Sequence, residues 1–183
     1  MKRVISLCMV CLMALSVCAV FSCTKNDDEV DNNEVNNNEV NNNEVNSPYV
    51  DLGLPSGTKW KKANEENTAD AEYDFFTYDE IVSKFGDRMP TKEQWEELKD
   101  SCTWTLTGDG YVVKGPNGNS IKLTASGYRD CSSGINGVGS YGYYWSSTPE
   151  GLENAWYLYF EPSGVSVLNY GRCYGYSVRL VQK

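Results

Sequence analysis

A five-residue repeat near the N-terminus sets the limit on which part of the chain can fold. The unit Glu-Val-Asn-Asn-Asn begins at Glu34 and again at Glu39, with variant copies beginning at Glu29 and Glu44. One valine among four polar residues buries too little apolar surface to offset the chain entropy that is lost on folding. We therefore expect residues 23–48 to be a disordered, Asn-rich tether. Residues 49–183 are then the folded domain, which is long enough to enclose one core.

The first 22 residues have the pattern of a secretory signal peptide. Lys2 and Arg3 precede an apolar stretch from Val4 to Phe21, and the small residue Ser22 stands directly before Cys23. These are the typical parts of a signal with its cleavage site, although hydropathy alone also fits an uncleaved N-terminal anchor. The ending Val-Phe-Ser-Cys resembles a bacterial lipobox. That resemblance implies that residues 1–22 are removed and that Cys23 carries a lipid anchor, with a plain secretory signal as the alternative.

The residues after Cys23 bear on where the protein is displayed. Thr24-Lys25-Asn26-Asp27-Asp28 places a lysine before an acidic run. This segment resembles the surface-export signal of lipoproteins in Bacteroidota-type bacteria. The resemblance implies a lipid-anchored protein of the bacterial outer membrane that faces outward, and the periplasmic face is the alternative.

Charge and residue types exclude several classes of function. The formal net charge is -9, and an acidic surface repels phosphate backbones, so we expect no nucleic acid partner. The chain contains no histidine, the commonest general base and metal ligand. We accordingly expect no metal site, no cofactor and no catalytic residues. Paired carboxylates are the alternative that the sequence leaves open, because its 25 acidic residues give too many possible pairs.

Three cysteines fall in the expected domain, namely Cys102, Cys131 and Cys173. Their spacing contains no CxxC pair, which argues against a structural zinc site or a redox motif. An odd number permits at most one internal disulfide, and the sequence does not indicate which pair would form it. We expect buried free thiols.

Two capping boxes predict two short helices. Thr77 and Glu80 form the first box, with Phe76 placed to pack on Ile81, and Gly86 suits the end of that helix. The second box stands at 91–94. Its helix carries an apolar face at i, i+3 and i+7, formed by Trp95, Leu98 and Cys102.

From Thr103 onward the pattern has period two, which is typical of strands. Residues 111–114 and 120–123 flank a Gly-Pro-Asn-Gly-Asn turn and predict a hairpin. Residues 156–160 alternate, and residues 176–181 are expected to form the closing strand. Two helices followed by many short strands predict an α+β fold with a twisted, mainly antiparallel sheet.

Four blocks of this domain resemble one family. They are residues 49–57 (YVDLGLPSG), 88–95 (RMPTKEQW), 144–148 (YWSST) and 175–181 (GYSVRLV). They look like the recurrent blocks of the Fibrobacter succinogenes major paralogous domain, which is similar to formylglycine-generating enzymes and to the C-type-lectin-like fold. The resemblance implies a C-type-lectin-like domain in a lipoprotein. The chain departs from the family between Ala63 and Tyr78, where a longer insert with a Trp-Gly-Glu stretch is missing.

The resemblance also allows two family activities to be compared with the residues of this chain. Formylglycine-generating enzymes depend on a close pair of cysteines near the C-terminus, where this chain has Cys173 alone. Glu161-Pro162-Ser163 is similar to the calcium-and-sugar motif of C-type lectins, but Ser163 stands where asparagine is needed. The Trp-Asn-Asp segment that completes the calcium site is absent, so we expect neither that chemistry nor calcium.

The segment from Tyr141 to Tyr176 is the best candidate for a binding site. It holds 11 aromatic residues, whereas aromatics make up 13% of the whole chain, and tyrosine suits recognition surfaces. We assign Trp145, Trp156, Leu158 and Phe160 to the core, with Tyr143, Tyr144 and Tyr176 lining the sheet. The expected ligand-binding residues, on a wet face and in the loop before the closing strand, are Tyr157, Tyr159, Asn169, Tyr170 and Tyr174.

The same C-terminal region carries the diversified ligand contacts in C-type-lectin-like variable proteins of diversity-generating retroelements. The resemblance therefore implies a surface-displayed lipoprotein that binds a glycan or protein ligand without turnover. The alternative is a structural cell-envelope lipoprotein whose aromatic residues serve packing alone. A hydrolase is a more distant third possibility.

Overall fold

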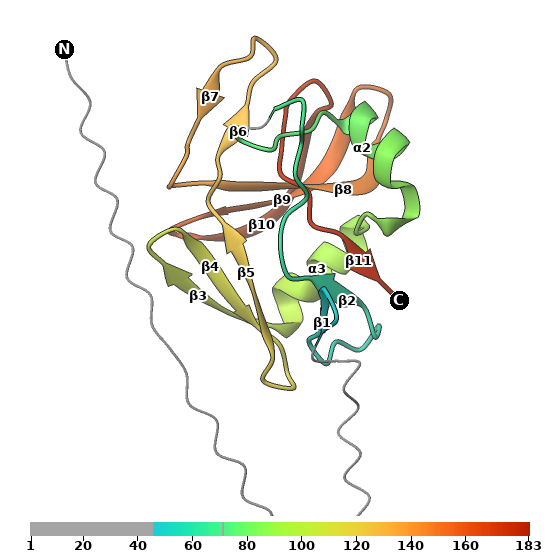
Figure 1. The fold of residues 1–183 in the computed structure, drawn as a ribbon, viewed down its shortest axis with the longest axis vertical. Helices are drawn as coiled ribbons and strands as arrows, with labels where there is room; N and C mark the ends of the chain where they lie inside the picture. The colour runs from blue at the N-terminus through green and yellow to red at the C-terminus, as the bar shows by residue number, and fades with distance from the viewer. Residues whose placement is uncertain (1–45, 71) are drawn as a thin grey trace, which may run out of the picture. The chain divides into compact units, whose positions relative to one another are not determined.

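The computed structural model describes residues 46–70 and 72–183 (Figure 1). The expected signal peptide, Cys23 and most of the expected tether lie outside the described residues. Within the described residues, no helix is long and apolar enough to cross a membrane. The elements in chain order are β1 (Tyr49–Asp51), β2 (Lys59–Lys61), α2 (Tyr78–Phe85), η1 (Gly86–Arg88), α3 (Lys92–Ser101), β3 (Thr103–Thr107), β4 (Gly110–Lys114), β5 (Ser120–Thr124), β6 (Tyr128–Arg129), β7 (Ile135–Asn136), β8 (Gly142–Glu150), β9 (Asn154–Glu161), β10 (Gly164–Gly171) and β11 (Val181–Gln182).

The strands form small sheets in which every paired strand runs antiparallel to its neighbour. The sheet with the longest strands has the order β10-β9-β8, and the others have the orders β3-β4-β5, β1-β2-β11 and β6-β7. Helix α3 contacts β8, β9 and β10, and α2 contacts β8. The expected α+β class with two short helices and mainly antiparallel strands is confirmed.

Both predicted helix starts are confirmed by their hydrogen bonds. The Glu80 carboxylate accepts a bond of 2.7 Å from the backbone N–H of Thr77, directly before α2. The Gln94 side chain accepts one of 2.9 Å from the N–H of Thr91 before α3. Such reciprocal caps satisfy N–H groups that have no partner inside the helix. Gly86 ends α2 with a φ of 54°, a conformation that glycine adopts without strain.

The sheet β8-β9-β10 separates two clusters of buried side chains, because neighbouring residues of a strand point to opposite faces. The first cluster lies between this sheet, α3 and the β3-β4-β5 sheet, and the second lies between the opposite face, α2 and the segment 176–180. The first contains Leu52, Trp60, Trp95, Leu98, Tyr111, Val113, Ile121, Leu123, Tyr144, Leu158, Phe160 and Val181, among others. The second contains Phe76, Tyr78, Ile81, Phe85, Met89, Trp145, Ala155, Tyr157, Tyr176, Val178 and Leu180.

The predicted hairpin is confirmed, and the predicted closing strand is wrong in extent. Strands β4 and β5 pair with Tyr111 opposite Leu123. At the C-terminus only Val181–Gln182 forms a strand. Tyr176 makes an isolated bridge to Phe76, and Ser177 makes one to Tyr144. Because these consecutive residues bridge different neighbours, no continuous ladder forms between residues 176 and 180.

The expectation of free thiols is wrong for two of the three cysteines in the domain. Cys131 and Cys173 form a disulfide with a Cα–Cα distance of 5.2 Å. Cys102 is free and half-buried, and burial followed by the charge of Glu97 raises the pKa of its thiol to about 11. The disulfide joins the loop between β6 and β7 to the turn after β10.

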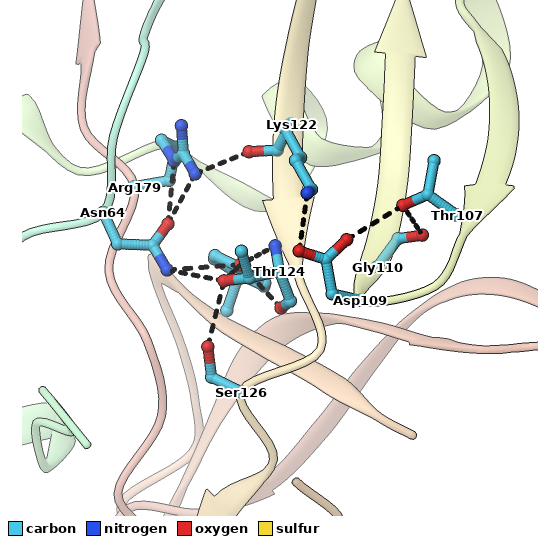
Figure 2. A network of polar contacts seen from close by, with 9 residues as sticks. Asn64, Thr107, Asp109, Gly110, Lys122, Thr124, Ser126 and Arg179 are labelled. Atoms are coloured by element: carbon cyan, nitrogen blue, oxygen red, sulfur yellow. Dashed lines mark hydrogen bonds and ion pairs between the residues drawn. The ribbon is translucent and has the colours of Figure 1, made fainter. Parts of the chain in front are cut away.

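Arg179 is a buried cation at the centre of a polar network (Figure 2). Its Nε and Nη2 atoms donate to Oδ1 of Asn64 at 3.0 and 2.6 Å. Its Nη1 donates to the carbonyls of Lys61 (2.8 Å) and Lys62, and Nη2 also donates to the carbonyl of Lys122 at 2.7 Å. All five N–H groups of the guanidinium are therefore bonded, and burial lowers its pKa. Arg179 ties the C-terminal segment to β2 and β5.

Candidate ligand-binding face

One face of the sheet β8-β9-β10 is covered by tyrosine rings. Tyr143 on β8 lies opposite Tyr159 on β9, and Trp145 lies opposite Tyr157. On the other side of β9, Tyr157 lies opposite Leu168 of β10. Directly opposed side chains of antiparallel strands point to the same face. Side chains from all three strands are thereby brought together on one surface.

Further tyrosines join this surface from outside the sheet. Tyr128 comes from β6, Tyr141 precedes β8, and Tyr174 and Tyr176 follow β10. Ring centroids are 4.8 Å apart for Tyr128 and Tyr143 and 5.0 Å apart for Tyr143 and Tyr176. We call this set the tyrosine face. It consists of Tyr128, Tyr141, Tyr143, Tyr157, Tyr159, Tyr170, Tyr174 and Tyr176.

The tyrosine face has a buried floor and an accessible rim. Tyr157 and Tyr176 form the floor with exposed fractions of 7% and 1%, next to the fully buried Trp145. Tyr170 is 53% exposed, and its ring lies 5.0 Å from that of the half-buried Tyr174. The other members are half-buried. A ligand could therefore reach the rim tyrosines but not the floor.

The prediction of an accessible ligand-binding position is wrong for two of the five residues, Tyr157 and Asn169. Tyr157 is buried because Tyr176 and its neighbours cover the face that we expected to be wet. Asn169 lies on the opposite face of the sheet, paired with Trp156. Asn169 and Tyr170 are also part of β10 rather than of a loop. Tyr159, Tyr170 and Tyr174 do lie together on the tyrosine face.

The predicted core residues are confirmed except for one. Trp145, Leu158 and Phe160 are buried, whereas Trp156 is half-buried. Its Nε1 donates to a carboxylate oxygen of Glu150 at 2.8 Å, and the ammonium of Lys92 lies 3.8 Å from its ring centroid. Trp156 lies close to the β8–β9 turn, at the border of the core.

Sequence reasoning missed Tyr128 and Tyr141 as members of this surface. Tyr141 shares its alternation with Tyr143, so the period-two pattern of strands could have revealed it. Tyr128 belongs to β6, a two-residue strand that is not part of the sheet β8-β9-β10. The next residue, Arg129, exchanges backbone hydrogen bonds of 2.9 and 2.8 Å with Gly175, which brings Tyr128 to this surface. A single sequence contains no signal for this long-range pairing.

Four hydroxyls of this face, those of Tyr143, Tyr157, Tyr159 and Tyr176, are neutral donors and acceptors at physiological pH. Burial, followed by the hydrogen bond that Tyr159 donates to Glu161 (3.1 Å), raises the pKa of Tyr159 to about 12. Burial likewise raises the pKa of Tyr143, Tyr157 and Tyr176. Phenols with raised pKa values stay protonated. The face thus offers apolar rings and uncharged hydroxyls, a combination suited to binding.

The segment 129–134, which borders the tyrosine face next to Tyr128, is held by an ion pair, by hydrogen bonds and by the disulfide. Arg129 forms an ion pair of 2.9 Å with Asp70. The Asp130 carboxylate accepts bonds of 2.8 and 2.9 Å from the backbone N–H groups of Gly134 and Ser132, and these bonds lower its pKa. The adjoining disulfide fixes the same loop. A border fixed in this way reduces the conformational entropy that binding would cost.

A hollow with a volume of about 1050 Å³ lies elsewhere on the described surface. It is lined by residues of β1, η1, α3 and β11, including Tyr49, Met89 and Gln94. Its buried hydroxyl, that of Thr58, is already bonded to Gln94 at 3.0 Å and to Ser56 at 2.7 Å. Among the described residues, no group of three or more metal-ligating side chains is placed to hold a metal ion.

The fold and site define a small α+β domain with an aromatic sheet face. A family model described as "Domain of unknown function (DUF8237)" matches residues 91–181. The matched range runs from the cap of α3 to the first residue of β11 and contains every member of the tyrosine face. Neither the curated proteins nor the solved structures contain a match to the chain.

Proposed function

We propose that this protein is a lipid-anchored binding module of the bacterial outer membrane, which uses the rim of the tyrosine face to hold a glycan or protein ligand without turnover. The observation that carries the proposal is the gathering of tyrosines from β6, β8, β9 and β10 on one surface, with Tyr170 exposed at its rim. Tyrosine supplies a large amphipathic contact area at low entropy cost.

The charge of the protein narrows the kind of ligand. The net charge is -9, and Glu161 lies beside Tyr159 on this face. Fixed negative charges repel phosphorylated polymers and other polyanions. Neutral glycans and neutral or basic protein surfaces are therefore the ligands that suit this site.

The resemblance to the Fibrobacter succinogenes major paralogous domain and to the C-type-lectin-like fold remains part of the proposal. Its supports are the α+β architecture and the positions of the four sequence blocks. Tyr144–Thr148 lies within β8, and Gly175–Val181 is the buried segment that borders the tyrosine face. The structural alternative, a cell-envelope lipoprotein without a ligand, is favoured only by the burial of Tyr157 and Tyr176.

Membrane attachment is tested at Cys23. Cys23→Ser removes the thiol that would carry the lipid, so we expect the variant to leave the membrane fraction and appear in the soluble fraction. Cell fractionation with immunoblotting measures this distribution. A Cys23→Ser protein that stays membrane-bound and keeps residues 1–22 would instead support an uncleaved anchor.

Ligand binding is tested by removing the accessible rings together. Tyr159→Ala, Tyr170→Ala and Tyr174→Ala in one chain delete three rings from the rim of the tyrosine face and leave the floor of Tyr157, Tyr176 and Trp145 in place. We expect binding in a glycan array or a protein pull-down to be abolished, while the protein stays folded with a lowered melting temperature, because Tyr159 and Tyr174 only pack against the buried cluster from outside and Tyr170 is exposed. Purified full-length protein is the reagent in both assays.

The matched control is Leu106→Ala, which removes an exposed apolar side chain of β3 and should leave binding unchanged. If the full-length protein captures no ligand in either assay, or if the triple variant captures it as well as the parent, the tyrosine face is not the binding site. If the triple variant unfolds, the rim tyrosines serve packing and the structural alternative holds.

A further inference from the structure

Strand β10 has an open edge. In the sheet order β10-β9-β8 it stands at the end, and its eight residues pair with β9 along their whole length. Among the described residues, no backbone hydrogen bond from outside β9 reaches residues 164–170. In an antiparallel pair, alternate residues direct their N–H and C=O groups away from the partner strand. These groups of β10 therefore face outward without a partner from the described part of the chain.

This edge also lacks the usual protection against pairing. Exposed edge strands of monomeric proteins commonly carry a lysine, a proline or a bulge, or are very short. Residues 164–171 read Gly-Val-Ser-Val-Leu-Asn-Tyr-Gly and contain neither a charge nor a proline. Leu168 and Tyr170 are 41% and 53% exposed on the tyrosine face. A long, uncharged edge with exposed apolar side chains is a template for another strand.

We propose that the edge of β10 pairs with β10 of a second copy of this chain, antiparallel and centred on Leu168. A two-fold axis perpendicular to the sheet keeps each side chain on its own face, so opposed residues must share parity. With the centre at Leu168, this residue lies opposite the partner's Leu168, and Tyr170 lies opposite the partner's Ser166. The isologous pairing is closed, as in most homodimers, and it joins two three-stranded sheets into one.

The side chains of the strand favour its own copy as the occupant. The two exposed apolar side chains of the strand are brought to the shared edge together, and no charges are opposed, because residues 164–171 are uncharged. The rest of the chain is acidic, with a net charge of -9, so the two copies repel at long range. Salt screens this repulsion but leaves backbone pairing intact, and dimerisation should therefore strengthen as the salt concentration rises. The pairing does not require that the tyrosine face bind a ligand.

A cysteine at the proposed centre tests both the contact and its register. Directly opposed Cβ atoms of antiparallel strands lie about 4.5–5.5 Å apart, close to the range in which disulfides form. Purified full-length Leu168→Cys, treated with a mild thiol oxidant, should give a covalent dimer. Peptide mass spectrometry should identify its link as position 168 joined to position 168. Sedimentation velocity of the parent protein should show a reversible monomer–dimer equilibrium.

Two control variants separate this contact from chance collision and from the other open edge. In Tyr170→Cys the two cysteines are displaced by four residues, about 13 Å along the strands, so no 170–170 link should form. Leu168→Lys opposes two charges and should shift the parent equilibrium to monomer, whereas Thr105→Lys on the edge strand β3 should not. A parent that is monomeric at every concentration, equal linking at positions 168 and 170, or loss of the dimer only in Thr105→Lys would each overturn the proposal.

Discussion

Replacing Arg179 by alanine is expected to destabilise the domain by about 3 kcal/mol or more, because several neutral acceptors lose the donor that they share. The guanidinium is 2% exposed and donates to Asn64 and to the carbonyls of Lys61, Lys62 and Lys122. Alanine leaves these acceptors without their donors, and an unsatisfied buried acceptor costs about 1–3 kcal/mol. Denaturant unfolding followed by tryptophan fluorescence measures the change.

Two further variants separate the role of the guanidinium from that of its neighbours. Arg179→Lys keeps the charge but offers three donors instead of five, so it should recover only part of the lost stability. Lys122→Ala keeps the carbonyl that Arg179 uses and loses only an exposed ion pair with Asp109 (2.6 Å). Such pairs contribute about 0–1 kcal/mol. An Arg179→Ala loss no larger than that of Lys122→Ala would show that the network does not stabilise the fold.

Local signals in the sequence predicted the local structure of this domain well. The capping boxes at Thr77 and Thr91 and the hairpin turn at 115–119 involve neighbours a few residues apart, and all are present. The role of Arg179 could not be predicted in this way. Its partners at positions 61, 62, 64 and 122 come from distant parts of the chain, and a charge inside an apparent strand normally indicates a wet face.

Only part of the candidate site could be predicted, because alternation along a strand sorts residues between two faces without showing which face is exposed. Alternation correctly placed Leu158 and Phe160 on one face of β9, with Tyr157 and Tyr159 on the other. A period of two does not show which face is wet, and here both faces are covered. The Cys131–Cys173 disulfide could not be predicted either, because it joins residues that are 42 positions apart. Cysteine spacing alone does not determine which two residues meet.

Trp145→Ala is expected to cost about 3–5 kcal/mol, the range for removing a fully buried tryptophan. Trp145 has no exposed surface, and its ring centroid lies 4.2 Å from that of Tyr176. Its Nε1 donates to the carbonyl of Phe76 at 2.8 Å, so one side chain joins β8 to the strand-like segment before α2. Because Trp145 also packs under the floor of the tyrosine face, the same change should weaken any ligand capture.

The neighbouring tryptophan gives the matched comparison. Trp156→Ala removes the same side chain from a half-buried site whose indole N–H bonds to Glu150 near the surface, and its cost should be clearly smaller. Trp145→Phe retains an aromatic ring but loses the bond to the carbonyl of Phe76, which still accepts one of 3.0 Å from the N–H of Tyr176, so the loss should be about 0.5–1.5 kcal/mol. Thermal and denaturant unfolding of the three variants should therefore rank Trp145→Ala as the least stable. Equal losses for Trp145→Ala and Trp156→Ala would mean that Trp145 does not anchor the second cluster, and the floor of the tyrosine face would then rest on Tyr157 and Tyr176 alone.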